Sequence, residues 1–312
     1  MIRRTVVVVF VLACIGIVTV QPAFAAGMKS RPKETMSEVP DDPNGRDATV
    51  RPVLLAYGFA YQKVDFLIDS LRTIQDDLLT IGVPSIISGK EAFAPIEHNA
   101  RIMRDEILEF LDDHPEFKKI DIIAHSKGGL EARYMITHLG MAEHVASLTT
   151  LSTPHRGSPV AEFLIDDSGD GGRMIAAAVA NAIGQLLGDV DPDSEASMSE
   201  LTPKYLERFN ADTPDHPDVY YLSYAADIGE DFPNLFYRTI GNALYEQVGP
   251  NDGLVPVESA KWGEFGGLVN EIYGHKGLSH NDLIGGTSSD DDDAFDFVGF
   301  YRDIVRKVQG SR

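Results

Sequence analysis

The chain has 312 residues, of which 43% are hydrophobic and 24% charged, so it can bury a sizeable core as one large domain or two small ones. Its formal net charge of −21 argues against binding to nucleic acid or to anionic membrane surfaces, and it fits an uncharged substrate. The single cysteine, Cys14, excludes an intramolecular disulfide.

The first 25 residues have the pattern of a secretory signal peptide. Arg3 and Arg4 precede an apolar run from Thr5 to Val20, and Ala23-Phe24-Ala25 then supplies a small-residue cleavage signal. We therefore predict a secreted protein, extracellular or periplasmic, that loses residues 1–25 and with them its cysteine. Removal of the two arginines makes the remaining chain still more acidic.

Residues 26–49 are rich in Pro, Asp, Lys and Glu, which predicts a poorly ordered lead-in to a domain at residues 50–312. Short apolar runs predict strands at residues 50–57, 83–88, 119–124, 145–151 and 219–224. Apolar residues at helical spacing predict helices at residues 65–81, 96–111, 130–139 and 294–308. Strands that alternate with helices predict an α/β domain with a mostly parallel central sheet and helices on both of its faces.

Residues 160–217 interrupt this alternation. The stretch Arg173–Leu187 is unusually apolar and is flanked by clusters of Gly and Asp. Such a helix is typical of a cap or lid over an apolar site, the alternative being a further core helix. Residues 197–209 predict a second helix of the same kind, so we expect a helical cap insertion at about residues 160–217.

The segment 119–130, KIDIIAHSKGGL, combines an apolar strand, a tight turn at Ser126 and the start of a helix. A turn this sharp requires small residues two positions before and after the serine, and Ala124 and Gly128 occupy those positions. The pattern is that of the nucleophile elbow of α/β-hydrolases, usually written G-x-S-x-G. The alternative is a serine that only caps a helix. In an elbow, the N–H of Lys127 would point towards the carbonyl oxygen of a substrate.

An activated serine needs a base that takes its proton and an acid that orients the base, and in α/β-hydrolases the acid precedes the histidine in the chain. His280, in the Gly-rich loop before the last helix, is the predicted base, with His275 in the same loop as the fallback. Asp252 is the predicted acid, an ordinary Asp-Gly turn being the alternative. The other histidines after Ser126 suit the role less well: His138, His144, His155 and His216.

Five motifs occur in a recognisable order: Gly58-Phe59, AHSKGGL at 124–130, STPHRGS at 152–158, NDGLVPV at 251–257 and SHND at 279–282. This order resembles the bacterial secreted triacylglycerol lipases of the Pseudomonas and Burkholderia type, the family I true lipases, over residues 50–308. The resemblance implies an α/β-hydrolase fold and a carboxylic-ester hydrolase that works through an acyl-enzyme. It assigns Ser126 as the nucleophile, Asp252 as the acid and His280 as the base.

The same resemblance implies an oxyanion hole formed by the backbone N–H groups of Phe59 and Lys127. It also implies a structural calcium ion held by Asp227 and Asp282, the alternative being that both aspartates are merely solvated. No organic cofactor is implied. The usual His-Gly before the oxyanion residue is Tyr57-Gly58 here, and the cysteine pair of many members is missing. Some members need a dedicated folding chaperone, and the sequence leaves that requirement and the oligomeric state open.

The predicted substrate is a neutral lipid or ester, with triacylglycerol favoured and a lipid–water interface as its setting. Two alternatives keep the same residues: a depolymerase for polyesters such as polyhydroxyalkanoate, and a short-chain esterase. A third, of another class, is a secreted non-catalytic binding protein on a hydrolase scaffold.

Overall fold

The computed structural model describes residues 50–58, 65–91, 94–165, 197–286 and 294–310. The predicted signal peptide, the lead-in, the oxyanion residue Phe59 and the lid helix at 173–187 lie outside these described residues. Within them, no helix is both long enough and apolar enough to cross a membrane.

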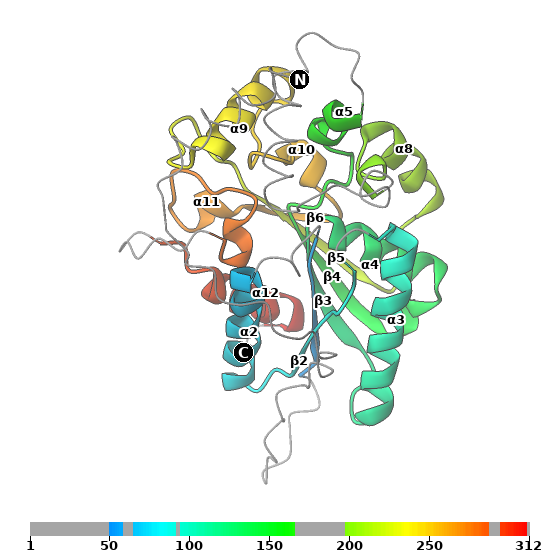
Figure 1. Ribbon diagram of the computed structural model, residues 1–312. Coiled ribbons are helices and arrows are strands. Elements are labelled where there is room, and N and C mark those ends of the chain that lie inside the picture. The colour runs from blue at the N-terminus through cyan, green and yellow to red at the C-terminus, as the bar shows by residue number, and fades with distance from the viewer. Residues whose placement is uncertain (1–49, 59–64, 92–93, 166–196, 287–293, 311–312) are drawn as a thin grey trace, which may run out of the picture. The chain divides into compact units, whose positions relative to one another are not determined.

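In the described part of the chain, one sheet of six parallel strands forms the centre of the domain (Figure 1). The strands are β1 (Val53–Ala56), β2 (Ser85–Ile87), β3 (Ile120–His125), β4 (Val145–Leu151), β5 (Tyr220–Ala225) and β6 (Glu264–Leu268). Their spatial order is β2-β1-β3-β4-β5-β6. Along the chain, β1 is the first strand of the sheet, β2 pairs with it at the edge, and β3 pairs with it on the other side. Ligands of parallel sheets bind where the strand order reverses in this way, beyond the carboxyl ends of the strands.

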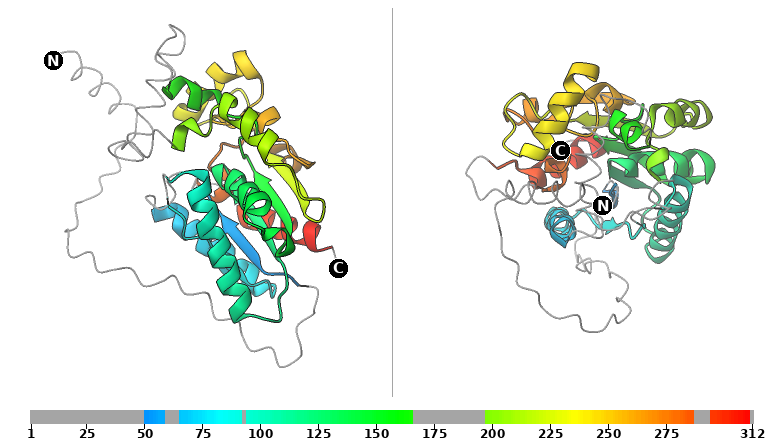
Figure 2. Two further views of the ribbon diagram at one scale, coloured as in Figure 1. Left: turned by 90° about the vertical axis from the view of Figure 1, so that its right-hand side faces the viewer. Right: turned by 45° about the horizontal axis from the view of Figure 1, so that its top comes forward.

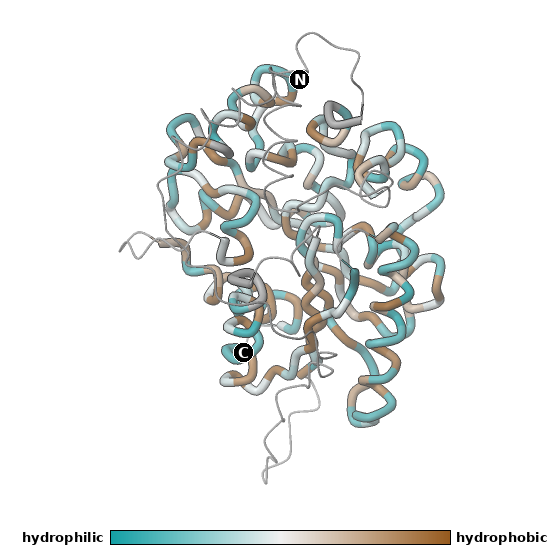
Figure 3. The backbone as a smooth tube through the Cα atoms, viewed as in Figure 1, coloured by the Kyte–Doolittle hydropathy of each residue, from teal (hydrophilic) through white to brown (hydrophobic). Residues whose placement is uncertain are grey.

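Side chains alternate between two buried layers along the strands. Val53 and Leu55 of β1 face one apolar cluster, which also contains residues of α2 (Asp65–Thr80) and α12 (Phe297–Gln309). Leu54 and Ala56 face the opposite cluster with α3 (Ile96–Asp113) and α4 (Lys127–His138). Figure 1 shows these two helix pairs on opposite sides of the sheet, and Figure 3 shows the hydrophobic residues concentrated along the strands. The predicted α/β architecture with helices on both faces is confirmed.

Elsewhere in the described residues, the named helical elements lie between β4 and α12 in the chain, apart from a short 3-10 turn η2 (Met141–Glu143). They are α5 (Pro159–Ile165), α8 (Pro203–Asp212), α9 (Leu235–Val248), α10 (Val257–Ala260), α11 (Val269–Ile272) and η3 (Asp282–Ile284). Val160 of α5 packs against Ile240 and Leu244 of α9, so these two helices share a small core of their own. Figures 1 and 2 show both helices at the same end of the sheet.

Several predicted boundaries are wrong, for reasons that the structure makes plain. The helix expected at residues 197–209 is interrupted: residues 197–199 are helical, a turn follows at 200–202, and α8 begins at Pro203. Thr202 caps α8 by accepting a hydrogen bond from the Tyr205 N–H. The helix expected at 294–308 begins at Phe297, because Asp296 is its N-cap and accepts from the Gly299 N–H. The elbow helix begins at Lys127 and not at Leu130, immediately after the turn.

Candidate active site

The turn between β3 and α4 holds Ser126 in a strained backbone conformation, with φ 54° and ψ −133°. Non-glycine residues rarely adopt a positive φ, and such strain persists only where the surroundings enforce it. Here the neighbouring strand enforces it. The Ser126 N–H donates to the Leu151 carbonyl oxygen at 2.9 Å, and the Thr153 hydroxyl donates to the Ser126 carbonyl oxygen at 2.7 Å. The serine is therefore fixed at the carboxyl end of β3.

Small residues surround this turn because there is no space for side chains. A Cβ atom on Gly58 would lie 2.5 Å from the Ser126 Cβ and 3.2 Å from the Lys127 nitrogen. A Cβ on Gly128 would lie 3.0 Å from the Tyr57 carbonyl oxygen, and one on Gly129 would lie 2.3 Å from the Thr153 hydroxyl. The end of β1 thus packs directly on the serine. Lys127 is the first residue of α4, so its N–H has no acceptor within the helix; it lies directly after the serine.

Replacing Gly58 by alanine is expected to lower kcat about 10²-fold, because the new methyl group must displace Ser126 or the chain after β1 by about 1 Å. Steady-state hydrolysis of a soluble ester measures this loss. Gly140→Ala is the matched control, since Gly140 has φ 73° and open space around its Cα. That control should lose stability and keep kcat. Equal activity in the Gly58 variant and the wild type would show that the contact with Ser126 does not matter.

The structure brings Asp252 and His280 together. The Asp252 Oδ2 lies 2.7 Å from the His280 Nδ1, and both side chains are buried. The other carboxylate oxygen, Oδ1, accepts hydrogen bonds from the N–H groups of Leu254 and Val255 at 3.0 and 2.7 Å. The His280 N–H also donates to the Asp252 carbonyl oxygen at 2.9 Å. The carboxylate is therefore held by its own turn, and it holds the imidazole by one ring nitrogen.

Asn251 stabilises the acid turn from inside the protein. Its side-chain amide donates to the carbonyl oxygens of Gly241 and Gly249, each at 3.0 Å. Its amide oxygen accepts from the Gly253 N–H at 2.9 Å. Gly253 has φ 92° and faces the Tyr237 ring, where a Cβ would clash at 2.6 Å. The turn is thereby fixed to α9, a helix that was not among those predicted from the sequence.

His280 approaches the Ser126 turn from the side of His125. Its ring lies against His125, the residue before Ser126, with ring centroids 4.4 Å apart. In the described part of the chain no hydrogen bond joins the Ser126 hydroxyl to the His280 ring. Such contacts are commonly long in hydrolases without substrate and shorten when substrate binds. His275, the fallback base, lies instead against the Phe295 ring, with centroids 5.6 Å apart.

The chain resembles lipases in sequence. Residues 88–166 match the family described as PGAP1-like alpha/beta domain. Triacylglycerol lipase 2 of Saccharomyces cerevisiae is 31% identical over 209 residues, which are 65% of this chain and 58% of that protein. A triacylglycerol lipase of Burkholderia plantarii is 31% identical over 180 residues, which are 54% of this chain and 49% of that protein. The chain therefore spans about half the length of the curated relatives that it matches.

Solved structures decide the fold. The mature form of a Bacillus licheniformis lipase superposes with a TM-score of 0.62 at 16% identity, covering 85% of this chain and 96% of that chain. A metagenomic carboxyl esterase superposes with a TM-score of 0.63 at 17% identity, covering 93% and 82%. The chain has the α/β-hydrolase fold. The predicted fold class is thereby confirmed.

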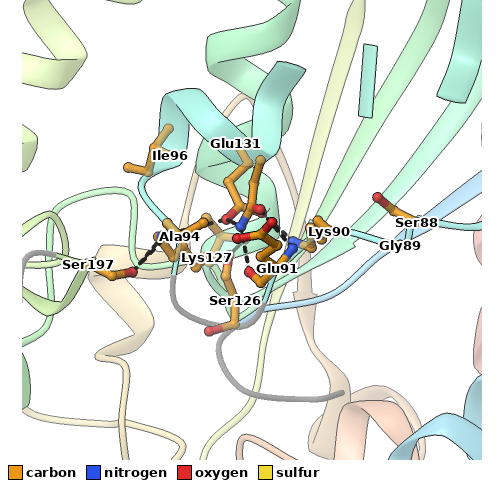
Figure 4. A network of polar contacts seen from close by, with 12 residues as sticks. Ser88, Gly89, Lys90, Glu91, Ala94, Ile96, Ser126, Lys127, Glu131 and Ser197 are labelled. Carbon is orange, nitrogen blue, oxygen red and sulfur yellow. Dashed lines mark hydrogen bonds and ion pairs between the residues drawn. The ribbon is translucent and has the colours of Figure 1, made fainter. Parts of the chain in front are cut away.

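A buried ionic network lies behind the Ser126 turn (Figure 4). The Lys127 ammonium donates to the Ala94 carbonyl oxygen and to the Ser197 hydroxyl, and it lies 3.6 Å from Glu131. Glu131 in turn pairs with the buried Lys90. The Lys127 side chain is therefore committed to this network. Burial lowers the pKa of Lys90, and the Glu131 carboxylate opposes that shift.

The network joins three separate segments of the chain: the loop before α3 with the first turn of that helix, the first two turns of α4, and the segment at 197–200. Glu200 accepts from the Ile96 N–H at 2.8 Å and lies 3.5 Å from the Lys127 ammonium. Asn99 donates to Glu131 at 2.8 Å. No local sequence pattern indicates that a lysine directly after Ser126 is buried, so this network could not be predicted from the sequence.

Removing one charge of this network should unfold the protein more easily. Glu131→Gln leaves two ammonium groups buried with less compensation, and we expect a loss of about 3–5 kcal/mol in the free energy of unfolding. Urea denaturation measures it. The matched control is Glu97→Gln, which breaks an exposed pair with Arg101 and should change stability little. A loss in the Glu131 variant no greater than in the control would contradict the buried pairing.

Of the predicted calcium ligands, Asp282 lies in the histidine loop, and Asp227 lies beside it, accepting from the Leu278 N–H through its backbone carbonyl oxygen at 2.8 Å. Asp282 accepts from the Ser279 N–H at 2.6 Å, and Asp227 accepts from the N–H groups of Gly229 and Asn251. Across the described residues, no three His, Cys, Asp or Glu side chains gather into a group that could hold a metal ion. A calcium site here would need backbone oxygens or water as further ligands, and calcium binding stays a prediction.

His155, another histidine of the sequence motifs, has a structural role. Its ring stacks on Trp262 with centroids 5.0 Å apart and lies 3.1 Å from the Thr150 hydroxyl. The Arg133 guanidinium lies over the Trp262 ring, with its central carbon 3.7 Å from the ring centroid. Burial lowers the pKa of His155 well below its ordinary value, so its ring is neutral. This cluster braces α4 against β4, the loop that follows β4 and the segment before β6.

Proposed function

We propose that this protein is a serine carboxylic-ester hydrolase that acts on lipid esters, with Ser126, His280 and Asp252 as its catalytic triad. The observation that carries the proposal is the buried Asp252–His280 pair, at 2.7 Å, facing a strained serine turn at the strand-order reversal of an α/β-hydrolase sheet. Similarity to triacylglycerol lipases in sequence supports the same class of reaction.

In the proposed reaction, the Ser126 Oγ attacks the ester carbonyl carbon while the His280 Nε2 takes the hydroxyl proton. Asp252 keeps the other proton of the imidazole on Nδ1 and stabilises the imidazolium that forms. The Lys127 N–H receives the oxyanion, with the N–H of Phe59 as the predicted second donor. His280 then returns its proton to the leaving alcohol. Water, activated by the same imidazole, releases the acid from the acyl-enzyme.

Triacylglycerol is the proposed substrate, because the sequence relatives are named triacylglycerol lipases. Membership of the family I lipases is proposed from the order of the motifs. Secretion is proposed from the signal-peptide pattern of residues 1–25. Structural calcium remains a prediction that rests on Asp227 and Asp282.

A substrate panel tests this assignment. We expect hydrolysis of an emulsified long-chain triglyceride at a rate comparable with, or above, that of a soluble short-chain ester, and slow release from a polyester film. Preference for the film would indicate a depolymerase, and activity on the soluble ester alone would indicate an esterase. No activity on any of the three would contradict the proposal. Thermal unfolding after complete chelation, measured beside the same panel, tests calcium binding. If calcium is bound, we expect the chelated protein to have a lower melting temperature.

A further inference from the structure

The backbone of His280 is held from two sides. Its N–H donates to the Asp252 carbonyl oxygen, and its own carbonyl oxygen lies 2.9 Å from the His125 Nε2. The planes of the two imidazole rings are inclined by 50° at a centroid distance of 4.4 Å. His125 is 3% exposed and is the last residue of β3, directly before Ser126. The nucleophile's neighbour in the chain is thus in contact with the loop that carries the base.

The chemistry of this contact fixes the protonation of His125. A carbonyl oxygen only accepts hydrogen bonds, so the His125 Nε2 carries a proton and donates it. Burial lowers the pKa of His125 well below its ordinary value, and the charge on a protonated His280 acts in the same direction. The ring is therefore neutral near pH 7, and its one proton is committed to the His280 carbonyl oxygen.

We propose that His125 is a positioning residue, which sets the separation between the Ser126 hydroxyl and the His280 ring. The proposal rests on the proposed function, because it concerns the base of that triad. His125 pairs with Leu151 in the sheet and shares its rigid strand with the serine turn. Its hydrogen bond therefore ties the histidine loop to the sheet at the point where the nucleophile emerges.

Asp252 cannot supply this restraint. It orients the imidazole through Nδ1 and holds the His280 N–H, but the acid turn belongs to a different loop, fixed to α9 through Asn251. When the His125 bond is lost, His280 keeps both contacts with Asp252 and can still shift relative to Ser126. A shift of about 1 Å at a proton-transfer step lowers its rate on the order of 10²-fold. The loss should appear in kcat and leave KM for a small soluble ester nearly unchanged.

Three substitutions at one position separate this role from a packing role. His125→Leu replaces the ring by an apolar side chain, which fills space but has no hydrogen-bond donor. His125→Gln places an N–H at nearly the reach of Nε2, whereas His125→Asn is also polar but too short. We expect kcat about 10²-fold lower for the Leu and Asn variants, and within about fivefold of the wild type for the Gln variant. Should the Leu variant not fold, the Gln–Asn pair carries the same comparison. Equal activity of Gln and Asn variants would overturn the proposal.

A double-mutant cycle with His280→Ala shows whether His125 acts through the base. In that background we expect His125→Leu to change the residual rate of hydrolysis by less than about twofold, because there is no imidazole left to position. A further large loss would mean that His125 acts on the elbow itself, and it would overturn the proposal. If His280→Ala alone keeps full activity, the proposed function fails. If His280→Ala is inactive but His125→Leu keeps kcat, this inference alone fails.

Discussion

Replacing Ser126 by alanine is expected to lower kcat for ester hydrolysis on the order of 10⁴- to 10⁶-fold, because the variant lacks the atom that forms the acyl-enzyme. The change removes one oxygen from a turn whose backbone contacts run through the Ser126 N–H and carbonyl oxygen and not through its hydroxyl. We therefore expect the melting temperature to stay near that of the wild type. Steady-state kinetics on a soluble ester, with thermal unfolding of the same sample, measures both.

Ser152 provides the matched control for this experiment. Apart from Ser126, it is the only non-glycine residue with a positive φ in the described part of the chain, at 47°. It lies at the end of the neighbouring strand β4, and its hydroxyl is buried with no hydrogen-bond partner. We expect Ser152→Ala to keep its activity. A folded Ser126→Ala protein with more than about a tenth of the wild-type rate would contradict the assignment of the nucleophile.

Replacing Asp252 by asparagine is expected to lower kcat on the order of 10⁴-fold without unfolding the turn. The amide oxygen should take the place of Oδ1, which accepts from the Leu254 and Val255 N–H groups. The amide NH₂ then faces the His280 Nδ1, which must become an acceptor. The ring proton is driven to Nε2, and the imidazole can no longer take a proton from Ser126.

The pH-independent part of the rate, measured for the wild type and Asp252→Asn, tests this reasoning. Asp303→Asn is the control, because Asp303 is an exposed carboxylate on α12 that bonds to Tyr273. It should leave kcat unchanged. An Asp252→Asn protein with full activity would show that this carboxylate does not orient the base, whatever its distance from the ring.

Much of the fold could be predicted because its central strands are buried on both sides. β3 reads as a continuous apolar run interrupted by Asp121, which is itself buried and bonded to Arg51 and Ser147. β6 could not be predicted, because its sequence, EFGGL, carries two glycines and forms only by pairing with β5. α9 was missed, although Ile240 and Leu244 give it an apolar face at helical spacing.

The site shows the same division between local and long-range information. Chain order and turn chemistry were enough to predict Asp252 and His280 as partners, and the structure has them in contact. The bond from His125 to His280 spans 155 positions, and no local pattern indicates it. The burial of Lys127 is equally invisible in the sequence, since it depends on Glu131, Ser197 and Glu200 meeting around one ammonium group.

Covalent labelling with a fluorophosphonate, followed by mapping of the modified peptide, tests the central claim most directly. We expect one adduct per chain, on Ser126, formed quickly by the wild type, slowly by Asp252→Asn and His280→Ala, and not at all by Ser126→Ala. A folded wild-type protein that takes no label, or that takes it on another residue, would contradict the proposed triad.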